Sequence, residues 1–303
     1  MIKNPVPWPD GARVAVAFTW DLDADSLLHI MHPDTSYRRV ATQSLMRYGP
    51  EIGVPRIVEM SKRYGVPMTF FTPGWSVEHY PEAIETILEG GCELAHHGYL
   101  HENPNEQSPA KEFYWLQRAS ESIRRASGKK PTGYRAPWFK YSEHTTEFLA
   151  KEGFLYDSTL MGDDVPYILK SKSGQLVELP FHWAMDDYPQ YIQNDDLNYF
   201  MPIKAPNQAM EVWEAEFEAM WEYGGLWVTV WHPFNSGRLA RCHRVAKLIE
   251  SMQKKGKVWF ATTEQIALHV KKVIDSGAYT PRVDTLPYYT ERIPELPEEL
   301  HER

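Results

Sequence analysis

The sequence predicts an α/β fold, a distorted (β/α)7–8 barrel that forms a single domain over residues 1–303. Short apolar segments typical of buried strands alternate along the chain with longer segments of helical periodicity. Repeated strand–helix units produce a parallel sheet with helices outside it. Seven or eight such strands close, or nearly close, a barrel. No linker, low-complexity run or internal repeat divides the chain.

The elements follow one another in a regular order. The predicted strands are residues 13–20, 68–71, 92–95, 132–134, 154–156, 176–179, 226–231 and 258–261. The predicted helices are residues 52–64, 80–89, 108–127, 142–152 (capped by Ser142), 207–223, 238–255 and 262–274. Residues 26–50 are long for a structureless connection, so we expect a loop that is either a lid or a partner surface. Residues 275–303 are expected to be a C-terminal tail that wraps the domain, packs on a neighbouring subunit or is mobile.

Composition narrows the class of protein. A hydrophobic content of 43% and a charged content of 24% are typical of a soluble globular protein. The net charge of −9 argues against a general nucleic-acid or anionic-membrane binder, and no apolar run is long enough to predict a transmembrane helix. Cys92 and Cys242 are far apart, and the N-terminus has no secretory pattern. We therefore expect two reduced thiols in a cytoplasmic protein.

Three residues are candidate metal ligands. His97 and His101 follow the predicted strand at 92–95, and Asp23 follows the strand at 13–20. The H-x-x-x-H spacing is weak by itself, because the chain has 12 His. Its position at a strand end strengthens it, since barrel enzymes place catalytic groups there. Two His and one carboxylate, with open positions left, favour a catalytic divalent metal, by default zinc with cobalt, nickel or manganese as alternatives. His96 is expected to be structural.

Two further residues are candidates for proton transfer. Asp21 lies two residues before Asp23, on the same side of the strand end. It is expected to act as the general base toward water at the metal, although the two carboxylates could instead share the ion. His232 ends the strand at 226–231 and is expected to protonate a leaving nitrogen. Asp157 is expected to orient His232, and Arg135 to orient Asp21 through a bidentate contact, with plain salt bridges as the alternative.

Aromatic residues are abundant, with 11 Trp, 17 Tyr and 12 Phe. They either fill the core or form the walls of a pocket, and several lie beside Pro and Gly. We expect four residues to contact the substrate, namely Trp75, Tyr99, Pro137 and Trp138.

Motifs throughout the chain are similar to those of one family. They are Trp20-Asp21-Leu22-Asp23, His97-Gly98-Tyr99-Leu100-His101, Arg135-Ala136-Pro137-Trp138, Val230-Trp231-His232 and, most loosely, Asp157-Ser158-Thr159-Leu160. With these motifs the chain resembles the NodB-homology, or polysaccharide deacetylase, family (carbohydrate esterase family four) over roughly residues 13–270. One departure is Gly98, which stands where the family has Ser or Thr and removes a side chain that helps to shape the loop.

The resemblance implies a distorted (β/α) barrel and specific roles. It implies a metal held by Asp23, His97 and His101, a base Asp21 steadied by Arg135, and an oxyanion held by the backbone N–H of Trp138. Further segments resemble an intracellular branch that includes peptidoglycan deacetylase, allantoinase-like proteins and cyclic imide hydrolases. These segments are His97–Pro104, Ala136–Trp138, Asp163–Tyr167 and Val177–Pro180. The branch implies a homo-oligomer, a dimer or tetramer, whose loops cover the site.

Together these observations predict a metal-dependent hydrolase of a non-peptide carbon–nitrogen bond. The absence of an export pattern, the loss of the hydroxyl at Gly98 and the many aromatics favour a small cyclic imide or ureide as substrate. The commonest activity of the family favours the alternative, N-deacetylation of an amino sugar, chitooligosaccharide or peptidoglycan. A non-catalytic metal-binding barrel is a second alternative from another class.

Overall fold

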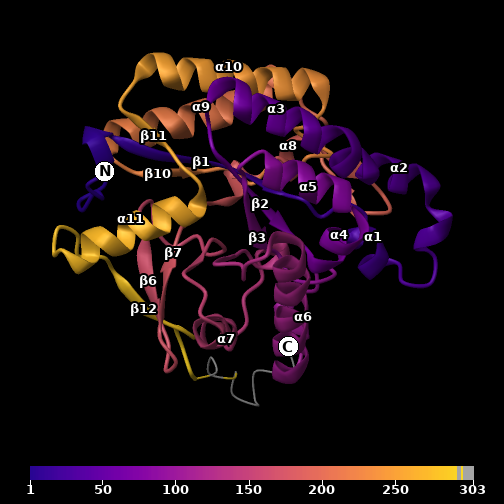
Figure 1. Cartoon of the computed structure of the whole chain (residues 1–303), viewed down its shortest axis with the longest axis horizontal. Helices are drawn as coiled ribbons and strands as arrows, with labels where there is room; N and C mark the ends of the chain where they lie inside the picture. Colours follow the sequence, from indigo (N-terminus) through magenta and orange to yellow (C-terminus); the bar gives the residue numbers. More distant parts are fainter. Residues whose placement is uncertain (292–294, 296–303) are drawn as a thin grey trace.

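A curled, mostly parallel sheet lies at the centre of the protein, with helices around it (Figure 1). The computed structural model describes residues 1–291 and 295. Its parallel strands are β1 (Val14–Asp21), β2 (Met68–Thr72), β3 (Glu93–His96), β4 (Gly133–Tyr134), β5 (Tyr156–Asp157), β7 (Gln175–Glu178), β10 (Leu226–Val228) and β11 (Val258–Phe260). The other strands are β6 (Tyr167–Lys170), β8 (Gln193–Asn194), β9 (Tyr199–Phe200) and β12 (Val283–Thr285). The predicted strands are thus confirmed in position.

The sheet curls into a distorted barrel, as predicted. Its strand order is β10-β1-β2-β3-β4-β5-β7, and β11 also pairs with the first half of β1. Among the described residues, no regular strand of this sheet closes the gap between β7 and β10, and β8 and β9 form a separate hairpin. Instead, a single parallel bridge joins Asp186 to Val230 in this gap. In this bridge the N–H of Val230 donates to the carbonyl of Met185 at 3.0 Å. Beyond β7, the antiparallel strand β6 and then β12 extend the sheet.

Most of the longer helices lie where the sequence predicts them. They are α3 (Val54–Tyr64), α5 (Pro81–Glu89), α6 (Pro109–Ser127), α7 (Thr145–Glu152), α9 (Pro206–Tyr223), α10 (Leu239–Lys255) and α11 (Thr263–Asp275). The helices α3, α9 and α10 lie together on one side of the molecule, and α6 and α7 lie on the opposite side (Figure 1). The helix α7 begins at Thr145 rather than Ser142; the Ser142 hydroxyl donates to Glu112 at 2.7 Å and accepts from the N–H of His144 at 3.0 Å in the turn before the helix.

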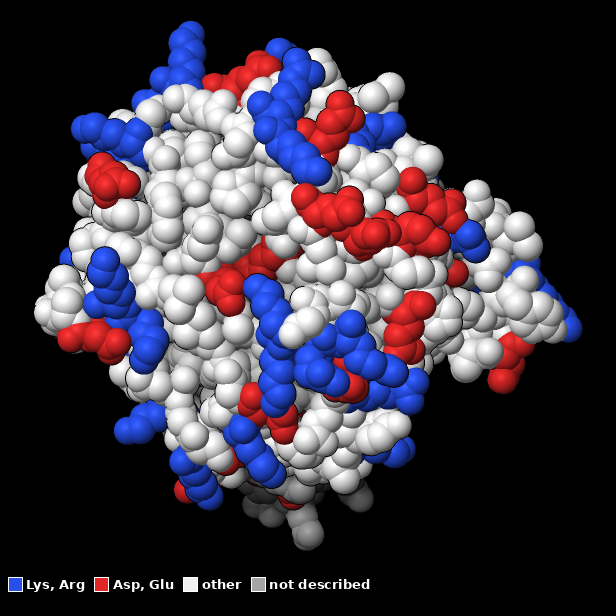
Figure 2. Space-filling view, in the orientation of Figure 1, with Lys and Arg blue, Asp and Glu red and all other residues white. Residues whose placement is uncertain are grey.

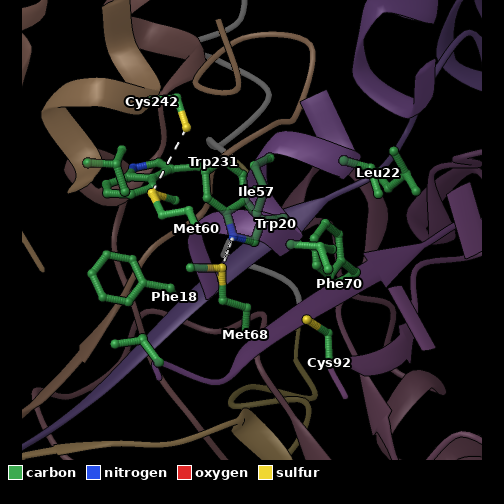
Figure 3. Packing of buried hydrophobic residues seen from close by; sticks show 14 of the residues in the cluster. Phe18, Trp20, Leu22, Ile57, Met60, Met68, Phe70, Cys92, Trp231 and Cys242 are labelled. Atoms are coloured by element: carbon green, nitrogen blue, oxygen red, sulfur yellow. Dashed lines mark hydrogen bonds between the residues drawn. The ribbon is translucent and has the colours of Figure 1, made fainter. Parts of the chain in front are cut away.

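The core holds the central strand rigidly. Every residue of β1 is buried, and Phe18 and Trp20 pack against Trp231 (Figure 3). The Trp20 indole Nε1 also donates to the sulfur of Met68 at 3.3 Å (Figure 3). Burying side chains of this size contributes about 1.5–3 kcal/mol each. The polar residues that follow the C-terminal end of β1 are therefore carried by one of the best-packed segments of the chain.

Two segments differ from expectation. Residues 26–50 are largely helical rather than a loop, with α1 (Ser26–Met31) and α2 (Val40–Tyr48). These helices are too short to show a clear periodicity, but Leu27, Leu28 and Met46 pack in an apolar cluster with Ile192 and Leu197. In the tail, β12 pairs with β6, so this part wraps the domain. The rest of the predicted tail, residues 292–294 and 296–303, lies outside the described residues.

The charged side chains on the surface and the two cysteines are arranged as the composition predicts. On the face shown in Figure 2, Lys and Arg side chains lie beside Asp and Glu in scattered groups, with broad uncharged areas between them. Among the described residues, no helix combines the length and apolar character needed to cross a bilayer. Cys92 and Cys242 are buried free thiols.

Candidate metal centre and catalytic site

Polar residues from four strand ends meet at one edge of the barrel. Asp21 ends β1 and Asp23 follows it, His97 follows β3, Arg135 follows β4, and His232 follows β10. All five side chains are buried. Since the strands are parallel, their carboxyl ends lie at the same edge, and residues distant in sequence are brought together.

Asp23 lies at the centre of a cluster of three imidazoles. Its Oδ1 lies 3.5 Å from Nε2 of His97, and its Oδ2 lies 3.7 Å from Nε2 of His101 and 3.4 Å from Nε2 of His232. Burial opposes ionisation of Asp23, but His101, His232 and His97 outweigh it and hold the pKa of this carboxyl below its ordinary value. Burial lowers the pKa of His101 to about 4, so this imidazole is neutral near pH 7.

The atoms of Asp23, His97 and His101 fit one bound cation. One candidate ligand atom from each lies within 4.8 Å of the other two. Two ligands on a tetrahedral zinc, each about 2.0–2.1 Å from the ion, lie about 3.3–3.4 Å apart, close to the separations found here. The Oδ1 of Asp23 is buried and has no hydrogen-bond partner among the described residues. A buried carboxylate with an unpaired oxygen, beside two imidazole nitrogens, is suited to a divalent metal.

The orientation of His97 is fixed by its second ring nitrogen. Nδ1 lies 2.7 Å from the carbonyl oxygen of Arg135. A carbonyl only accepts, so Nδ1 carries a hydrogen and Nε2 is the ring nitrogen directed toward Asp23. Nε2 is therefore the atom of His97 that could bind a metal.

The turn between the two histidines is held by Glu102. Its Oε1 accepts from the N–H of Tyr99 at 3.0 Å, and its Oε2 from the N–H of Leu100 at 2.7 Å. Gly98 has a φ of +70°, and a Cβ added there would lie 2.8 Å from Cγ of Pro137 and 3.1 Å from Oε1 of Glu102. His101 also has a positive φ, +65°. Neither the backbone conformation nor the space at position 98 thus suits the Ser or Thr that is usual there in the family.

Arg135 holds Asp21, as predicted, although by a different contact. Its Nη1 donates to Oδ1 of Asp21 at 2.7 Å and also to the hydroxyl of Thr19, while Nε and Nη2 both bond Ser158, so the pairing with Asp21 is single rather than bidentate. The guanidinium lies over the ring of Phe71 at 4.0 Å. The remaining Oδ2 of Asp21 lies 3.6 Å from Nε2 of His97 and faces the cluster.

The partner of His232 is Asp187, which sequence reasoning missed. Nδ1 of His232 donates to Oδ1 of Asp187 at 2.7 Å, while Oδ2 accepts from the N–H groups of His232 and Ser236, both at 3.1 Å. Burial opposes protonation of His232, but Asp187 and Asp23 outweigh it and raise the pKa of the imidazole well above its ordinary value. His232 therefore carries a proton on Nε2, 3.4 Å from Asp23.

The prediction that Asp157 orients His232 is wrong. Asp157 ends β5, which lies between β4 and β7, whereas His232 follows β10 beside β1. The Asp157 carboxylate accepts from Thr159 and lies beside Glu178; burial raises its pKa to about 6 and raises that of Glu178 further. The pair supports the strand ends that carry Arg135, because Thr159 also accepts from the N–H of Ala136. The sequence signal that could have identified the partner of His232 is the acidic pair Asp186-Asp187, which precedes Pro189 in an irregular segment and had been given no role.

A cavity of about 100 Å³ opens onto the cluster. Its polar lining is Asp21, Asp23, His97, His101, Asp186 and His232, and its apolar lining is Leu27, Trp138, Phe139, Trp183, Tyr188, Leu197 and Tyr199. Leu27 comes from α1, and Leu197 and Tyr199 come from the β8–β9 hairpin region. Residues 26–50, expected to be either a lid or a partner surface, thus contribute to the cavity, and they contact the hairpin, since Thr42 bonds Asp196 at 2.6 Å.

Of the four predicted substrate contacts, only Trp138 lines this cavity. It has a φ of +59°, and its indole Nε1 donates to the carbonyl of His101 at 3.0 Å. Trp75 lies elsewhere, stacked on His79 at 3.9 Å. Tyr99 stacks on Trp115 and bonds Glu78 and Arg118, and Pro137 contacts the turn at Gly98. His96 is structural, as expected, with Nε2 bonded to the carbonyl of Leu116 and a pKa lowered by burial to about 3.

The fold and the site define a barrel protein with a candidate Asp-His-His metal centre and adjacent acid–base residues. Comparison with known proteins identifies the family. The model of the polysaccharide deacetylase family matches residues 48–156. A peptidoglycan deacetylase of Helicobacter pylori is 31% identical over 247 residues, which cover 73% of this chain and 84% of the relative. The chain therefore belongs to the polysaccharide deacetylase family and is a hydrolase of carbon–nitrogen bonds other than peptide bonds.

Solved structures agree with this assignment. A crystal structure from Mycobacterium smegmatis, described as a polysaccharide deacetylase, is 42% identical, with a TM-score of 0.88 over 98% of this chain and 99% of that one. An allantoinase is 22% identical, with a TM-score of 0.78 over 92% of this chain and 96% of that one, a likeness that shows the fold alone.

Proposed function

We propose that this protein is a metal-dependent hydrolase that opens a small cyclic imide or ureide. The observation that carries the proposal is the cavity, which is small and is lined by aromatic residues next to the polar cluster. A single water needs about 10–15 Å³ of such space, so about 100 Å³ suits a planar ring of a few atoms better than a saccharide chain.

The residues are arranged for hydrolysis of an amide-type bond. Asp23, His97 and His101 would hold a divalent metal, zinc by default, which when bound supplies a Lewis acid for the carbonyl and for water. Asp21 accepts a proton from the attacking water, and Arg135 orients Asp21. The water oxygen bonds to the carbonyl carbon, and we expect the backbone N–H of Trp138 to stabilise the oxyanion.

His232 completes the reaction as the general acid. Its protonated Nε2 faces the cluster, and Asp187 keeps Nδ1 engaged. When the C–N bond breaks, His232 donates its proton to the leaving nitrogen, and the ring opens to a carboxylate and an amide or ureido group. The proton taken up by Asp21 is released to solvent, and His232 is reprotonated before the next turnover.

N-deacetylation of an amino sugar or peptidoglycan is the second candidate, and the name of the Helicobacter pylori relative favours it. The same residues would serve, with acetate and a free amine as products. The predicted homo-oligomer and the cytoplasmic location remain predictions in either case.

Mass spectrometry of the products distinguishes these substrates. Purified protein is incubated with succinimide, dihydrouracil, hydantoin, allantoin and N-acetylglucosamine oligomers, once with zinc and once with chelator. We expect a zinc-dependent gain of one water on at least one ring compound, lost in Asp21→Asn and kept in Asp25→Asn, a matched change at a buried Asp that bonds Tyr80 outside the cavity. Loss of acetyl from the oligomers, with all rings untouched, would contradict the proposal.

A further inference from the structure

One polar group in the cavity has no role in the chemistry described above. The side chain of Tyr188 lines the cavity together with Asp23, Asp186 and His232. Its hydroxyl oxygen is buried and makes no hydrogen bond to any described residue. Buried hydroxyls normally have a partner, because leaving one unpaired costs stability. A ligand in the cavity would provide that partner.

The position of the Tyr188 ring is fixed by packing. The ring lies 4.9 Å from that of His232, 6.1 Å from that of Phe234 and 5.2 Å from that of Tyr199, to which it is perpendicular. Its backbone N–H donates to Oδ1 of Asp186 at 2.8 Å. The ring is therefore held beside the proton donor without any contribution from its hydroxyl.

A second tyrosine of the same helix, α8 (Tyr188–Tyr191), provides the comparison. The hydroxyl of Tyr191 is also buried without a partner among the described residues. Tyr191 does not line the cavity; its ring packs near Trp213 and under the guanidinium of Arg241 at 4.0 Å. An unpaired hydroxyl alone thus indicates no ligand, and it is the place of Tyr188 in the cavity that does.

The surroundings make the Tyr188 hydroxyl a donor. Burial and the nearby carboxylates Asp23, Asp186 and Asp187 raise its pKa well above the ordinary value, so the hydroxyl keeps its hydrogen. The acceptor in the ligand must therefore be an oxygen or nitrogen with a free lone pair. A carbonyl oxygen meets this requirement.

We propose that Tyr188 determines specificity by donating a hydrogen bond to a second carbonyl oxygen of the substrate ring, the one that is not attacked. This inference rests on the proposed function, since a cyclic imide or ureide carries two ring carbonyls, whereas a lactam or an N-acetyl group carries one. A site built to bond a substrate group rejects the analogue that lacks it, because its own polar group is then left unpaired.

The test compares two rings that differ by one carbonyl. Dissociation constants of succinimide and 2-pyrrolidinone are measured by calorimetry on zinc-loaded wild type, Tyr188→Phe and the matched control Tyr191→Phe, and kcat/KM is measured for succinimide. We expect Tyr188→Phe to weaken succinimide binding and lower kcat/KM by about tenfold. It should leave 2-pyrrolidinone binding unchanged, and Tyr191→Phe should change neither ligand.

The outcomes separate this inference from the proposed function. Equal effects of Tyr188→Phe on both rings, or no effect on either, would overturn the role of the hydroxyl even if succinimide is hydrolysed. Tyr188-dependent discrimination in binding without any hydrolysis of a ring compound would support the role and overturn the proposed function. Wild type that neither binds nor hydrolyses succinimide, hydantoin or dihydrouracil would overturn both. Phe keeps the ring packing, and the melting temperature of each variant verifies its fold.

Discussion

The two sides of the cavity use the same residue types in opposite ways. On one side, Asp23 lies between His97 and His101, its pKa is lowered, and its Oδ1 has no hydrogen-bond partner among the described residues. On the other side, the carboxylate of Asp187 accepts three hydrogen bonds, two of them from His232. A carboxylate oxygen without a hydrogen-bond partner is available to a cation. A carboxylate whose two oxygens both accept hydrogen bonds instead orients the residue that donates them.

The imidazoles of His101 and His232, one on each side, have pKa values shifted in opposite directions. Burial dominates at His101 and lowers its pKa to about 4, whereas the carboxylates Asp187 and Asp23 dominate at His232 and raise its pKa. Two histidines within 4 Å of the same Asp23 therefore differ in charge because only one has a second carboxylate bonded to its ring. The proposed metal ligands need neutral imidazoles and the proposed acid needs a protonated one, and the pKa shifts of His101 and His232 have these directions.

The largest effect should come from the metal side. His101→Ala removes one of three candidate ligands, so we expect loss of stoichiometric zinc binding by metal analysis and a fall in kcat of about 10³-fold or more. Chelation of wild type should match this loss, and zinc should restore the wild type but not the variant. Retained stoichiometric zinc in His101→Ala would rule out the ligand set. His79→Ala, an exposed histidine stacked on Trp75, serves as the control.

The acid side is tested by comparing two buried aspartates. Asp187→Asn leaves the shape intact but removes the charge that orients and protonates His232, so kcat should fall about a hundredfold while zinc content stays unchanged. Asp157→Asn should keep kcat within about threefold, because Asp157 contacts Thr159 and Glu178 rather than His232. The reverse ranking in steady-state kinetics would restore Asp157 to the role that the sequence suggested.

The turn that presents the metal side is tested with alanine at two glycines. Gly98→Ala meets Pro137 and Glu102, whereas Gly91→Ala, at an equally positive φ of +68°, meets nothing within 4 Å. Both changes share the backbone strain, but only the first displaces the histidines. We expect zinc affinity, measured by competition with a chelating dye, to fall about 10–100-fold in Gly98→Ala alone. Equal affinities in the two variants would show that the crowding at Gly98 is unimportant.

The smallest effect concerns the carboxyl pair behind the site. Burial raises the pKa of Asp157 from 3.8 to about 6, so between these values the folded chain holds a proton that the unfolded chain releases. The free energy of unfolding contributed by this group therefore falls as pH rises from about 4 to about 6. Urea unfolding of Asp157→Asn should lack this fall and gain on the order of 1–3 kcal/mol relative to wild type over that range. Parallel pH curves for the two proteins would contradict the raised pKa.

Local patterns were sufficient to predict which residues meet in the candidate metal site. Asp21 and Asp23 directly follow a buried strand, and His97 and His101 follow another, so each side chain's place is set by the end of its own strand. Parallel strands then bring these ends to one edge whatever lies between them. Arg135 and His232 were found in the same way, because each also lies just beyond a strand.

The tertiary structure alone decided the partner of His232 and the walls of the cavity. Asp187 lies in an irregular segment that pairs with the barrel through the bridge between Asp186 and Val230, and no periodicity marks such a segment. Leu27 and Tyr199 line the cavity because α1 and the β8–β9 hairpin pack against each other, a contact between segments more than 160 residues apart. Strand ends follow from short-range hydrophobic pattern, whereas closure of the barrel and packing of its rim depend on long-range contacts that no local sequence pattern records.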